Sequence, residues 1–258
     1  MKRNLFEWMW FLIQEYGDSF LKGTWMTLLI AVIGTVLGYL LGFLIGVVQS
    51  TPDARPEDGT YKVGNRMLRS ILVRLRKAWN RLPKFICTIF VEVFRGTPMM
   101  VQAMVLYYGL KTMGSAITPF QAAILVTLLN TGAYMAETVR GGILALDPGQ
   151  QEGAKALGMG HFTTMFSVIL PQAFRNIIPE MGNLFITNLK MTSVLNVVGI
   201  SELYFVTKTA SNMFYCYFEA FTLTGLIYLF LCIIFSRLMK LLEKKLDGDS
   251  HYELVEEA

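Results

Sequence analysis

Residues 147–175 read DPGQQEGAKALGMGHFTTMFSVILPQAFR and form a polar stretch, rich in small residues, between two long apolar segments. Asp147 is a residue type that caps helix N-termini well, and Pro148 suits the first helical position because its missing N–H would have no partner there. Gln150 is placed to close a capping box. The pattern predicts a short helix over residues 151–157, in a loop of a chain that is otherwise strongly apolar.

Glycines and alanines shape both the end and the surface of this predicted helix. Gly158 and Gly160 favour its termination, since glycine adopts the left-handed conformation that closes many helices. Gly153, Ala154 and Ala156 lie in its middle and cover little surface. A glycine inside a helix costs about 1 kcal/mol relative to alanine, which indicates a packing reason. We therefore expect another protein to approach this backbone closely.

The composition is that of a membrane protein. Of the 258 residues, 53% are hydrophobic and 16% are charged, and the apolar residues fall in long blocks. A bilayer core of about 30 Å needs about 20 apolar residues in a helix. Five stretches are long enough, at about residues 21–48, 83–110, 118–144, 162–189 and 215–242. The sequence predicts an all-α integral membrane fold of five transmembrane helices.

Basic residues decide the predicted orientation. The loop between the first two spans carries Arg55, Lys62, Arg66, Arg69, Arg74, Arg76, Lys77 and Arg81, against only Asp53, Glu57 and Asp58. The positive-inside rule places this loop in the cytoplasm. Alternation of the spans then puts the 145–161 loop and the C-terminus in the cytoplasm and the N-terminus outside, in a multi-pass protein of the cell membrane. Basic residues at the membrane face also argue against nucleic-acid binding.

Three segments lie outside the predicted spans. Residues 1–20 are expected to form an interfacial segment anchored by aromatic residues, since Glu7 interrupts the apolar core that a signal peptide needs. The membrane domain, 21–245, includes a basic cytoplasmic insertion at 50–82, in which residues 63–82 are predicted to form an amphipathic helix on the inner leaflet. It is expected to set the topology and contact lipid, with a regulatory or ATPase-contacting role as the alternative. Residues 246–258 are predicted to form a loose polar tail.

Four blocks of sequence, in order along residues 20–245, carry a resemblance to a known family. They are Phe94-Arg95-Gly96-Thr97-Pro98 with Gln102, Ala133-Tyr134-Met135-Ala136-Glu137 with Arg140-Gly141-Gly142, Glu152-Gly153-Ala154 with Gly158 and Leu170-Pro171, and Lys190-Met191-Thr192-Ser193 with Glu202-Leu203. Together they resemble the ABC importer permeases of the polar amino-acid uptake family, whose cytoplasmic loop bears the EAA motif. The resemblance implies a type I importer fold in which helix 147–160 is the coupling helix that docks in the ATPase subunit. Its coupling residues would be Glu152, Gly153, Ala154, Leu157, Gly158 and Pro171.

The resemblance also implies a function. The chain would be the permease subunit of an ATP-driven importer that moves a polar amino acid inward by alternating access. Its partners would be two ABC ATPase subunits, an extracellular or periplasmic solute-binding protein, the lipid bilayer, and either a second copy or a sister permease. ATP and magnesium would bind the ATPase, and this chain would need no cofactor.

Two other classes stay open. One is an ion-coupled transporter or channel acting without an ATPase, and the other is a membrane-embedded enzyme or an assembly factor. We expect no enzyme activity, because the sequence has no Gly-rich phosphate loop ending in Lys-Ser/Thr and no recognisable catalytic set. Only two histidines occur, His161 and His251, so no metal site is expected.

Four glycines at a spacing of four residues mark one face of the first span: Gly34, Gly38, Gly42 and Gly46. Such a groove lets helices pack at short range in lipid. Its partner is predicted to be another span of this chain, with a second permease subunit as the alternative.

Polar residues within the second and third spans are candidates for a substrate pathway, because charge inside a membrane is costly unless it is paired or hydrated. Asn130, Tyr134 and Glu137 lie on one helical face, where Glu137 is suited to accept hydrogen bonds from a substrate ammonium or to form a structural ion pair. Gln102 is a further candidate. In the second span, Glu92 and Arg95 are spaced to pair with each other, and Pro98 is expected to bend the helix as a structural hinge. Contact with the substrate is the alternative role of this segment.

The fourth span is expected to be interrupted by Pro171, Pro179 and Gly182, exposing backbone groups that bind small polar ligands. Its end supplies the last pathway candidates, a cation followed by two hydroxyls: Lys190, Thr192 and Ser193. Lys190 is suited to hold a substrate carboxylate, to pair with Glu137 or Glu202, or to extend to the outer interface. Many relatives carry an acidic residue where this chain has Met191, and the difference favours a neutral or anionic amino acid over a cationic one.

Overall fold

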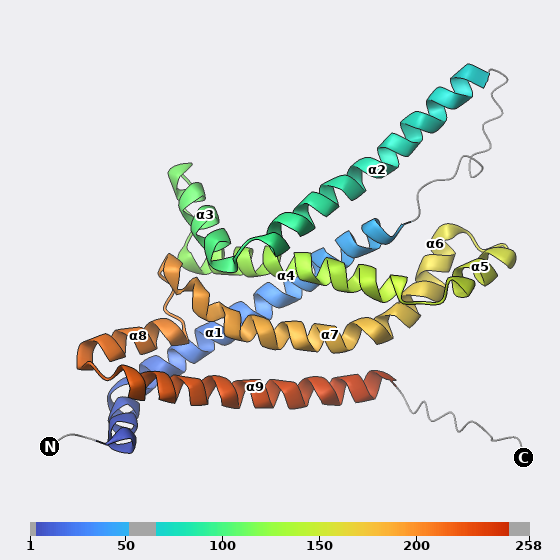
Figure 1. Cartoon of the computed structure of the whole chain (residues 1–258). Coiled ribbons are helices and arrows are strands. Elements are labelled where there is room, and N and C mark those ends of the chain that lie inside the picture. The colour runs from blue at the N-terminus through green and yellow to red at the C-terminus, as the bar shows by residue number, and fades with distance from the viewer. Residues whose placement is uncertain (1–3, 52–65, 248–258) are drawn as a thin grey trace, which may run out of the picture. The chain divides into compact units, whose positions relative to one another are not determined.

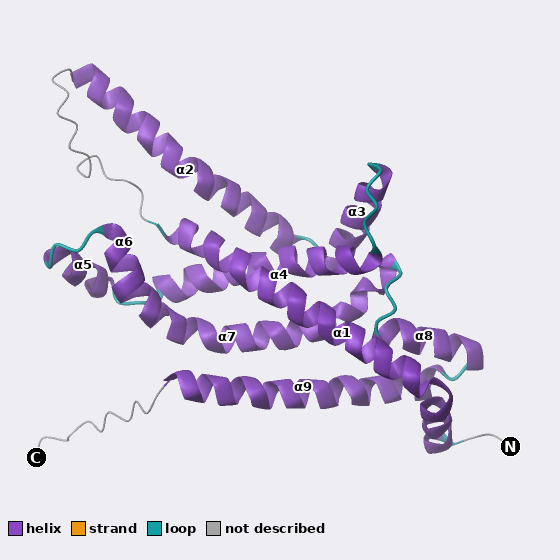
Figure 2. Cartoon of the chain, turned by 180° about the vertical axis from the view of Figure 1, so that it is seen from behind, coloured by secondary structure: helices purple, strands orange, loops and turns teal. Residues whose placement is uncertain are grey.

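The computed structural model describes residues 4–51 and 66–247, with side chains described for 4–51 and 81–245. Every regular element within these ranges is a helix (Figure 2). In chain order (Figure 1) they are α1 (Leu5–Ser50), α2 (Arg66–Gly96), α3 (Met99–Thr112), α4 (Pro119–Leu144), α5 (Pro148–Ala156), α6 (His161–Thr164), the π-helix η1 (Met165–Ile169), α7 (Leu170–Met191), the 3₁₀-helix η2 (Thr192–Val198), α8 (Leu203–Phe214) and α9 (Tyr217–Asp247).

Five membrane spans follow when bent helices are counted as one. In the part of the chain that the structure describes, α1, α4 and α9 are each long and apolar enough to cross a bilayer alone. Two further spans are bent pairs: residues 81–96 with α3, at 110°, and residues 161–198 with α8, at 57°. The first bend lies at Pro98, where the sequence predicts it, since proline removes a backbone donor and restricts the preceding residue.

The helices form two compact units. Among the described residues, one comprises 29–51, 66–145 and 194–200, and the other comprises 4–28, 146–193 and 201–247. The first unit contains the C-terminal part of α1 with α2, α3 and α4. The second contains the N-terminal part of α1 with α5 to α9.

The glycine face of α1 is buried within the first unit. A Cβ atom added at Gly42 would lie 2.5 Å from both the Gly132 carbonyl oxygen and the Met135 Cβ of α4. The other three glycines approach α4 equally closely, at Thr127, Thr131 and Val139. The predicted internal packing is therefore confirmed, and it explains why four glycines recur along α1.

The fourth span differs from its prediction. α7 runs unbroken through Pro179 and Gly182 (Figure 1). Gly182 instead lets α9 approach, because its added Cβ would lie 3.2 Å from the Met239 Cβ. The irregularity lies earlier, in η1, directly before the Leu170-Pro171 pair. Pro171 has no N–H for the α-helical bond, and wider π-helical winding precedes it.

Two segments predicted as separate are parts of longer helices. Residues 5–20 continue into the first span as α1, and their Leu12 and Phe20 are buried against a cluster that includes Leu203 and Ala210. This packing accounts for Leu12 and Phe20, whereas Phe6 and Trp10 are exposed, and the interfacial role of the segment stays a prediction. Likewise α2 runs without a break from Arg66 through Pro83 to Gly96. Residues 52–65 of the predicted insertion and the predicted tail from 248 lie outside the described residues.

Candidate functional site

The N-terminus of α5 is fixed by the predicted residues, with one difference. The Asp147 carboxylate accepts a hydrogen bond from the Gly149 N–H at 2.8 Å, and Pro148 is the first helical residue. Gln150 does not close a capping box. Its Oε1 accepts a hydrogen bond from Gln172 Nε2 at 3.1 Å, which ties α5 to α7.

The C-terminus of α5 ends in a Schellman motif. Gly158 has φ +79°, its N–H donates to the Lys155 carbonyl at 2.9 Å, and the Met159 N–H donates to the Ala154 carbonyl at 3.1 Å. A residue with a side chain is strained at this φ, so glycine is the suitable residue here. The predicted termination at Gly158 is confirmed, and α5 is a short helix capped at both ends.

The surface of α5 has one inward and one open side. Ala154 is buried, with 5% of its surface exposed. Glu152, Gly153, Leu157 and Gly158 are exposed, and a Cβ added at Gly153 would meet no atom within 4 Å. Leu157 is 80% exposed although it is apolar. Four of the six predicted coupling residues therefore share an open surface, whereas Ala154 packs inward and Pro171 lies in the first turn of α7.

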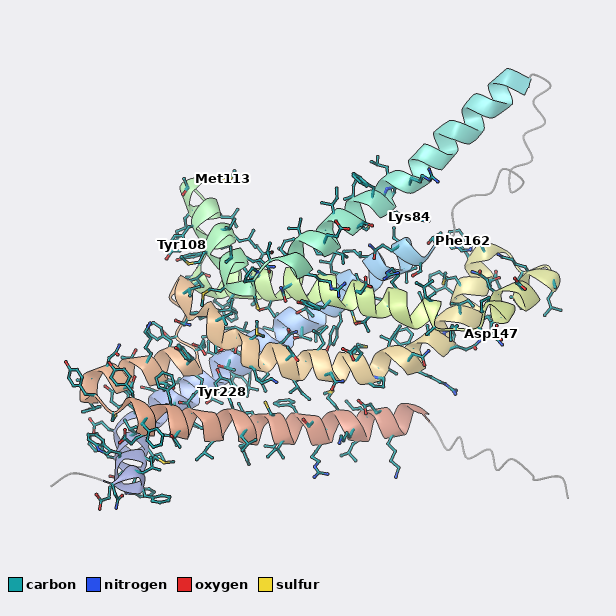
Figure 3. All side chains as sticks on the ribbon, viewed as in Figure 1. Lys84, Tyr108, Met113, Asp147, Phe162 and Tyr228 are labelled. Atoms are coloured by element: carbon teal, nitrogen blue, oxygen red, sulfur yellow. The ribbon has the colours of Figure 1, made fainter. Side chains whose placement is uncertain are left out.

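A second exposed apolar residue, this one aromatic, lies near α5 in the second unit. Phe162, on α6, is 78% exposed. Asp147 and Phe162 mark the starts of α5 and α6 in Figure 3. Phe162 therefore adds a second exposed apolar side chain close to α5.

The polar face of α4 meets α2. Arg95 places its guanidinium carbon 5.5 Å from the Tyr134 ring centroid and its Nη1 3.5 Å from Glu137 Oε2. The predicted shared face of Asn130, Tyr134 and Glu137 is thus observed. The ion pair expected within α2 is not: Arg95 pairs with Glu137 rather than with Glu92, because α4 brings that carboxylate close to it.

Gln102 and Asn130 hold the bend between α2 and α3. Gln102 Nε2 donates to the carbonyls of Phe94 and Thr97, at 2.8 and 3.0 Å, and its Oε1 accepts from Asn130 Nδ2 at 3.1 Å. Asn130 Nδ2 also donates to the Phe94 carbonyl at 3.2 Å. Carbonyls at the end of α2 lose their helical donors at Pro98, and these two amides replace them. Both predicted pathway residues are therefore already engaged within the chain.

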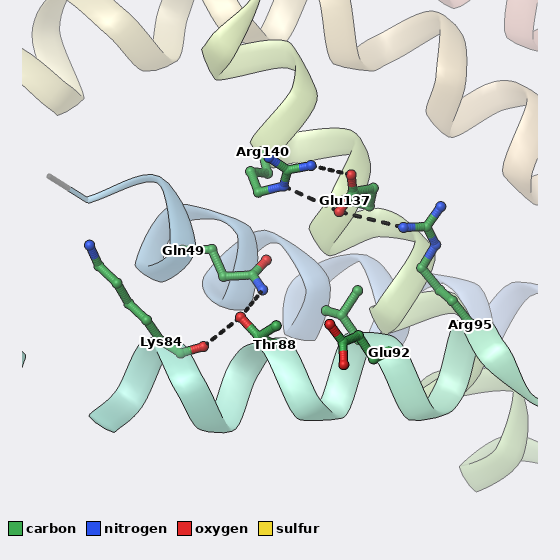
Figure 4. Close-up of a pocket in the computed structure, with 8 residues that line it drawn as sticks. Gln49, Lys84, Thr88, Glu92, Arg95, Glu137 and Arg140 are labelled. Atoms are coloured by element: carbon green, nitrogen blue, oxygen red, sulfur yellow. Dashed lines mark hydrogen bonds and ion pairs between the residues drawn. The ribbon is translucent and has the colours of Figure 1, made fainter. Parts of the chain in front are cut away.

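Glu137 also lines a cavity of about 450 Å³ in the first unit (Figure 4). Arg140 donates to both carboxylate oxygens of Glu137, with Nε to Oε2 at 3.2 Å. The lining residues are Gln49, Lys84, Thr88, Val91, Glu92, Arg95, Glu137 and Arg140. Three cationic groups face two carboxylates, so the cavity suits an anion or a zwitterion better than a metal cation. The sequence prediction missed Gln49, Lys84, Thr88 and Arg140; the three- and four-residue spacings along α2 and α4 were the available signal.

The pathway candidates at the end of α7 have local partners. Thr192 Oγ1 donates to the Leu189 carbonyl at 2.9 Å, and Ser193 Oγ donates to the Lys190 carbonyl at 2.7 Å. Lys190 is exposed and forms no ion pair within the described ranges. The Glu202 carboxylate is fully buried and accepts from two backbone N–H groups at the start of α8, so it serves as a helix cap.

Comparison with known proteins adds independent observations. A family model described as "Binding-protein-dependent transport system inner membrane component" matches residues 70–248. The chain is 38% identical to the arginine transport system permease protein ArtQ of Bacillus subtilis (strain 168), over 64% of this chain and 76% of that protein. It is 34% identical to the glutamine transport system permease protein GlnP of Escherichia coli (strain K12), over 62% of this chain and 74% of that protein.

Solved structures agree with the fold. A crystal structure of an amino acid ABC transporter with histidines has 31% sequence identity and a TM-score of 0.75, covering 95% of this chain and 100% of that one. An inward-facing structure of the MetNI methionine ABC transporter, 18% identical with a TM-score of 0.68, shares the fold over 90% of this chain and 97% of that one. The all-helical fold expected for an ABC importer permease is therefore confirmed. This chain belongs to the family of binding-protein-dependent transport system inner membrane components.

Proposed function

We propose that this chain is the permease subunit of an ATP-driven importer that moves a polar amino acid inward by alternating access. Support comes from family membership and from relatives named for arginine, glutamine and L-cystine transport. The observation that carries the coupling is the open surface of α5. It is short, capped at both ends, and exposes Gly153 and Leu157 to a partner.

In this proposal the partner of α5 is a nucleotide-hydrolysing subunit of the ABC class. A groove of that subunit approaches the backbone at Gly153, where no side chain intervenes, and covers Leu157. ATP and magnesium bind the ATPase, and closure of the ATPase dimer pushes α5. A solute-binding protein delivers the amino acid from outside, and a second copy or a sister permease completes the pathway.

The proposed topology follows the distribution of basic residues. The loop between α1 and α2 and the C-terminus face the cytoplasm, as does α5, and the N-terminus lies outside. This orientation places the docking surface on the side where ATP is available.

The proposed substrate pathway uses the polar groups of α4 and α7. Its candidates are Glu137 and Tyr134 on α4 in the first unit, and Lys190 on α7 with Thr192 and Ser193 at the start of η2 in the second. Gln102 and Asn130 contribute by holding the α2–α3 bend, since their amides already bond to its carbonyls. Met191, beside Lys190, favours a neutral or anionic amino acid.

Gly153→Leu tests the coupling. Leucine should fit the isolated chain, because a Cβ at Gly153 meets no atom within 4 Å, and it favours the helix by about 1 kcal/mol over glycine. It should nevertheless block close approach by the ATPase. We expect the variant to fold, to co-purify poorly with the ATPase, and to lose ATP-dependent uptake of labelled L-glutamine and L-arginine into proteoliposomes containing the binding protein.

A matched control is Gly225→Leu on α9, where a Cβ also meets nothing within 4 Å. It should retain both ATPase association and uptake. Full association and full uptake by Gly153→Leu would contradict docking at α5. Uptake by the purified chain with no ATPase present would instead support an ion-coupled transporter.

A further inference from the structure

The cavity in the first unit is lined by a polar stripe of α2. Lys84, Thr88, Glu92 and Arg95 are spaced by four, four and three residues, so all face the same side of the helix. Figure 4 shows these side chains along α2, opposite Glu137 on α4. A continuous polar stripe in a chain that is 53% hydrophobic is costly unless it is hydrated or binds a ligand.

One side of the cavity has an unbalanced positive charge. Glu137 accepts from Arg140 and also pairs with Arg95, so two guanidinium groups share one carboxylate. The three groups together carry a net charge of +1. Both arginines are about 40% exposed, at 40% and 38%, and so retain donor capacity toward the cavity. This side therefore suits a carboxylate, which arginine binds in a planar, two-point arrangement.

The same cavity also contains acceptors. Glu92 is exposed and forms no ion pair among the residues that the structure describes. Gln49 Oε1 is buried and has no hydrogen-bond partner there, while its Nε2 reaches Thr88 Oγ1 only at 3.4 Å. A buried acceptor without a donor is unfavourable by about 1–3 kcal/mol. An ammonium group in the cavity would supply donors to both Gln49 and Glu92.

We propose that this cavity is an inner binding site for the α-ammonium and α-carboxylate groups of an amino acid. The carboxylate binds Arg95 and Arg140, and the ammonium binds Glu92 and Gln49. This inference rests on the proposed function and adds a second position to the pathway, on the α1–α2–α4 side rather than at Lys190. The volume of about 450 Å³ lies within the usual range for small-molecule sites.

The proposed site recognises what all α-amino acids share. Val91 is the only apolar residue among its lining side chains, so selection of an apolar substrate side chain has one residue to rely on. Selection would then belong to the binding protein or to the α7 end of the pathway. Amino acids as different as L-glutamine and L-arginine should bind here at similar concentrations.

The experiment measures how fast a cysteine placed in the cavity reacts. In the complete transporter, reconstituted in nanodiscs without nucleotide, Cys87, Cys216 and Cys232 are replaced by serine and Thr88→Cys is added as the only thiol. The rate of thiol alkylation is measured with increasing L-glutamine or L-arginine. N-acetyl-L-glutamine, which lacks the ammonium, and L-glutamine methyl ester, which lacks the carboxylate, serve as blocked analogues. Each amino acid should slow alkylation, and each blocked analogue should require at least roughly tenfold more, since a lost charged hydrogen bond costs about 1.5–3 kcal/mol.

Glu92→Gln keeps the shape of the side chain and removes its charge, and it should raise the half-protecting concentration at least roughly tenfold. Glu15→Gln, an exposed carboxylate on α1 outside the cavity, should leave it unchanged. Absence of protection, equal protection by N-acetyl-L-glutamine, or an unchanged Glu92→Gln would each overturn the site. ATP-driven uptake is measured on the same preparations. Protection of the thiol without uptake would support the binding site and contradict the importer function. Uptake without protection would support the importer function and contradict the binding site.

Discussion

Gly42→Ala should destabilise the first unit, although alanine is the better helix former. The new methyl would lie 2.5 Å from the Gly132 carbonyl oxygen and from the Met135 Cβ, both of which are fixed by the backbone of α4. No rotamer change relieves such contacts, so α1 and α4 must separate by several tenths of an ångström or more along the glycine face of α1. Overpacking of this kind costs about 1–3 kcal/mol, against a gain in helix propensity of about 1 kcal/mol.

The matched control is Gly109→Ala on α3, where an added Cβ meets nothing within 4 Å. Both variants gain the same helix propensity, so the difference between them isolates the close contact, at about 1–3 kcal/mol. The assay is thermal unfolding of the purified chain in detergent, followed by circular dichroism. Gly42→Ala should unfold several degrees below Gly109→Ala. If Gly42→Ala were as stable as Gly109→Ala, the contact between the glycine face of α1 and α4 would not be as close as in the structure.

Three further substitutions test other contacts. Gln102→Leu should lower the free energy of unfolding by about 1–3 kcal/mol, because carbonyls at the α2–α3 bend lose their donors. Gln14→Leu, at an exposed position on α1, should change it little. Equal thermal unfolding midpoints for the two variants would contradict the role of Gln102. Glu137→Gln should lower the unfolding midpoint by an amount that shrinks at high salt, because its ion pairs are partly exposed; a salt-independent loss would argue against them. Gly158→Ala should cost about 1 kcal/mol at φ +79° and speed amide exchange in α5, and unchanged exchange would contradict the cap.

Local signals in the sequence predicted most of the elements. The third span was predicted at 118–144 from its apolar length, and α4 runs over Pro119–Leu144, where a capping box of Thr118 and Gln121 fixes its start. Asp147 and Pro148 mark the start of α5, and Gly158 marks its end, as predicted. The packing of the glycine face of α1 could be predicted because residues four positions apart lie on the same face of a helix.

Features that depend on packing between helices could not be predicted in this way. Arg95 has an acidic neighbour at i−3, and its sequence gives no reason to prefer Glu137, 42 positions later. The roles of Gln102 and Asn130 follow from which carbonyls the bend leaves without donors, and this is known only once α2 and α4 are packed. The predicted interruption at Pro179 was also wrong, because a helix packed against other helices tolerates proline where neighbouring groups bond to the carbonyl that loses its donor.

The contacts of α5 define how force would pass from an ATPase into the membrane helices. α4 ends at Leu144 and α5 begins at Pro148, so residues 145–147 are the only link on that side. On the other side, Gln150 bonds to Gln172 of α7. A helix attached by so short a connection and by a side-chain bond has little freedom to move alone. In the proposed coupling, a push on α5 would pass to α7 through the Gln150–Gln172 bond and to α4 through residues 145–147 of the chain. α4 carries the contacts with the glycines of α1, the Glu137 ion pairs and Asn130 at the α2–α3 bend, so this covalent connection is where the proposal would link α5 to the first unit.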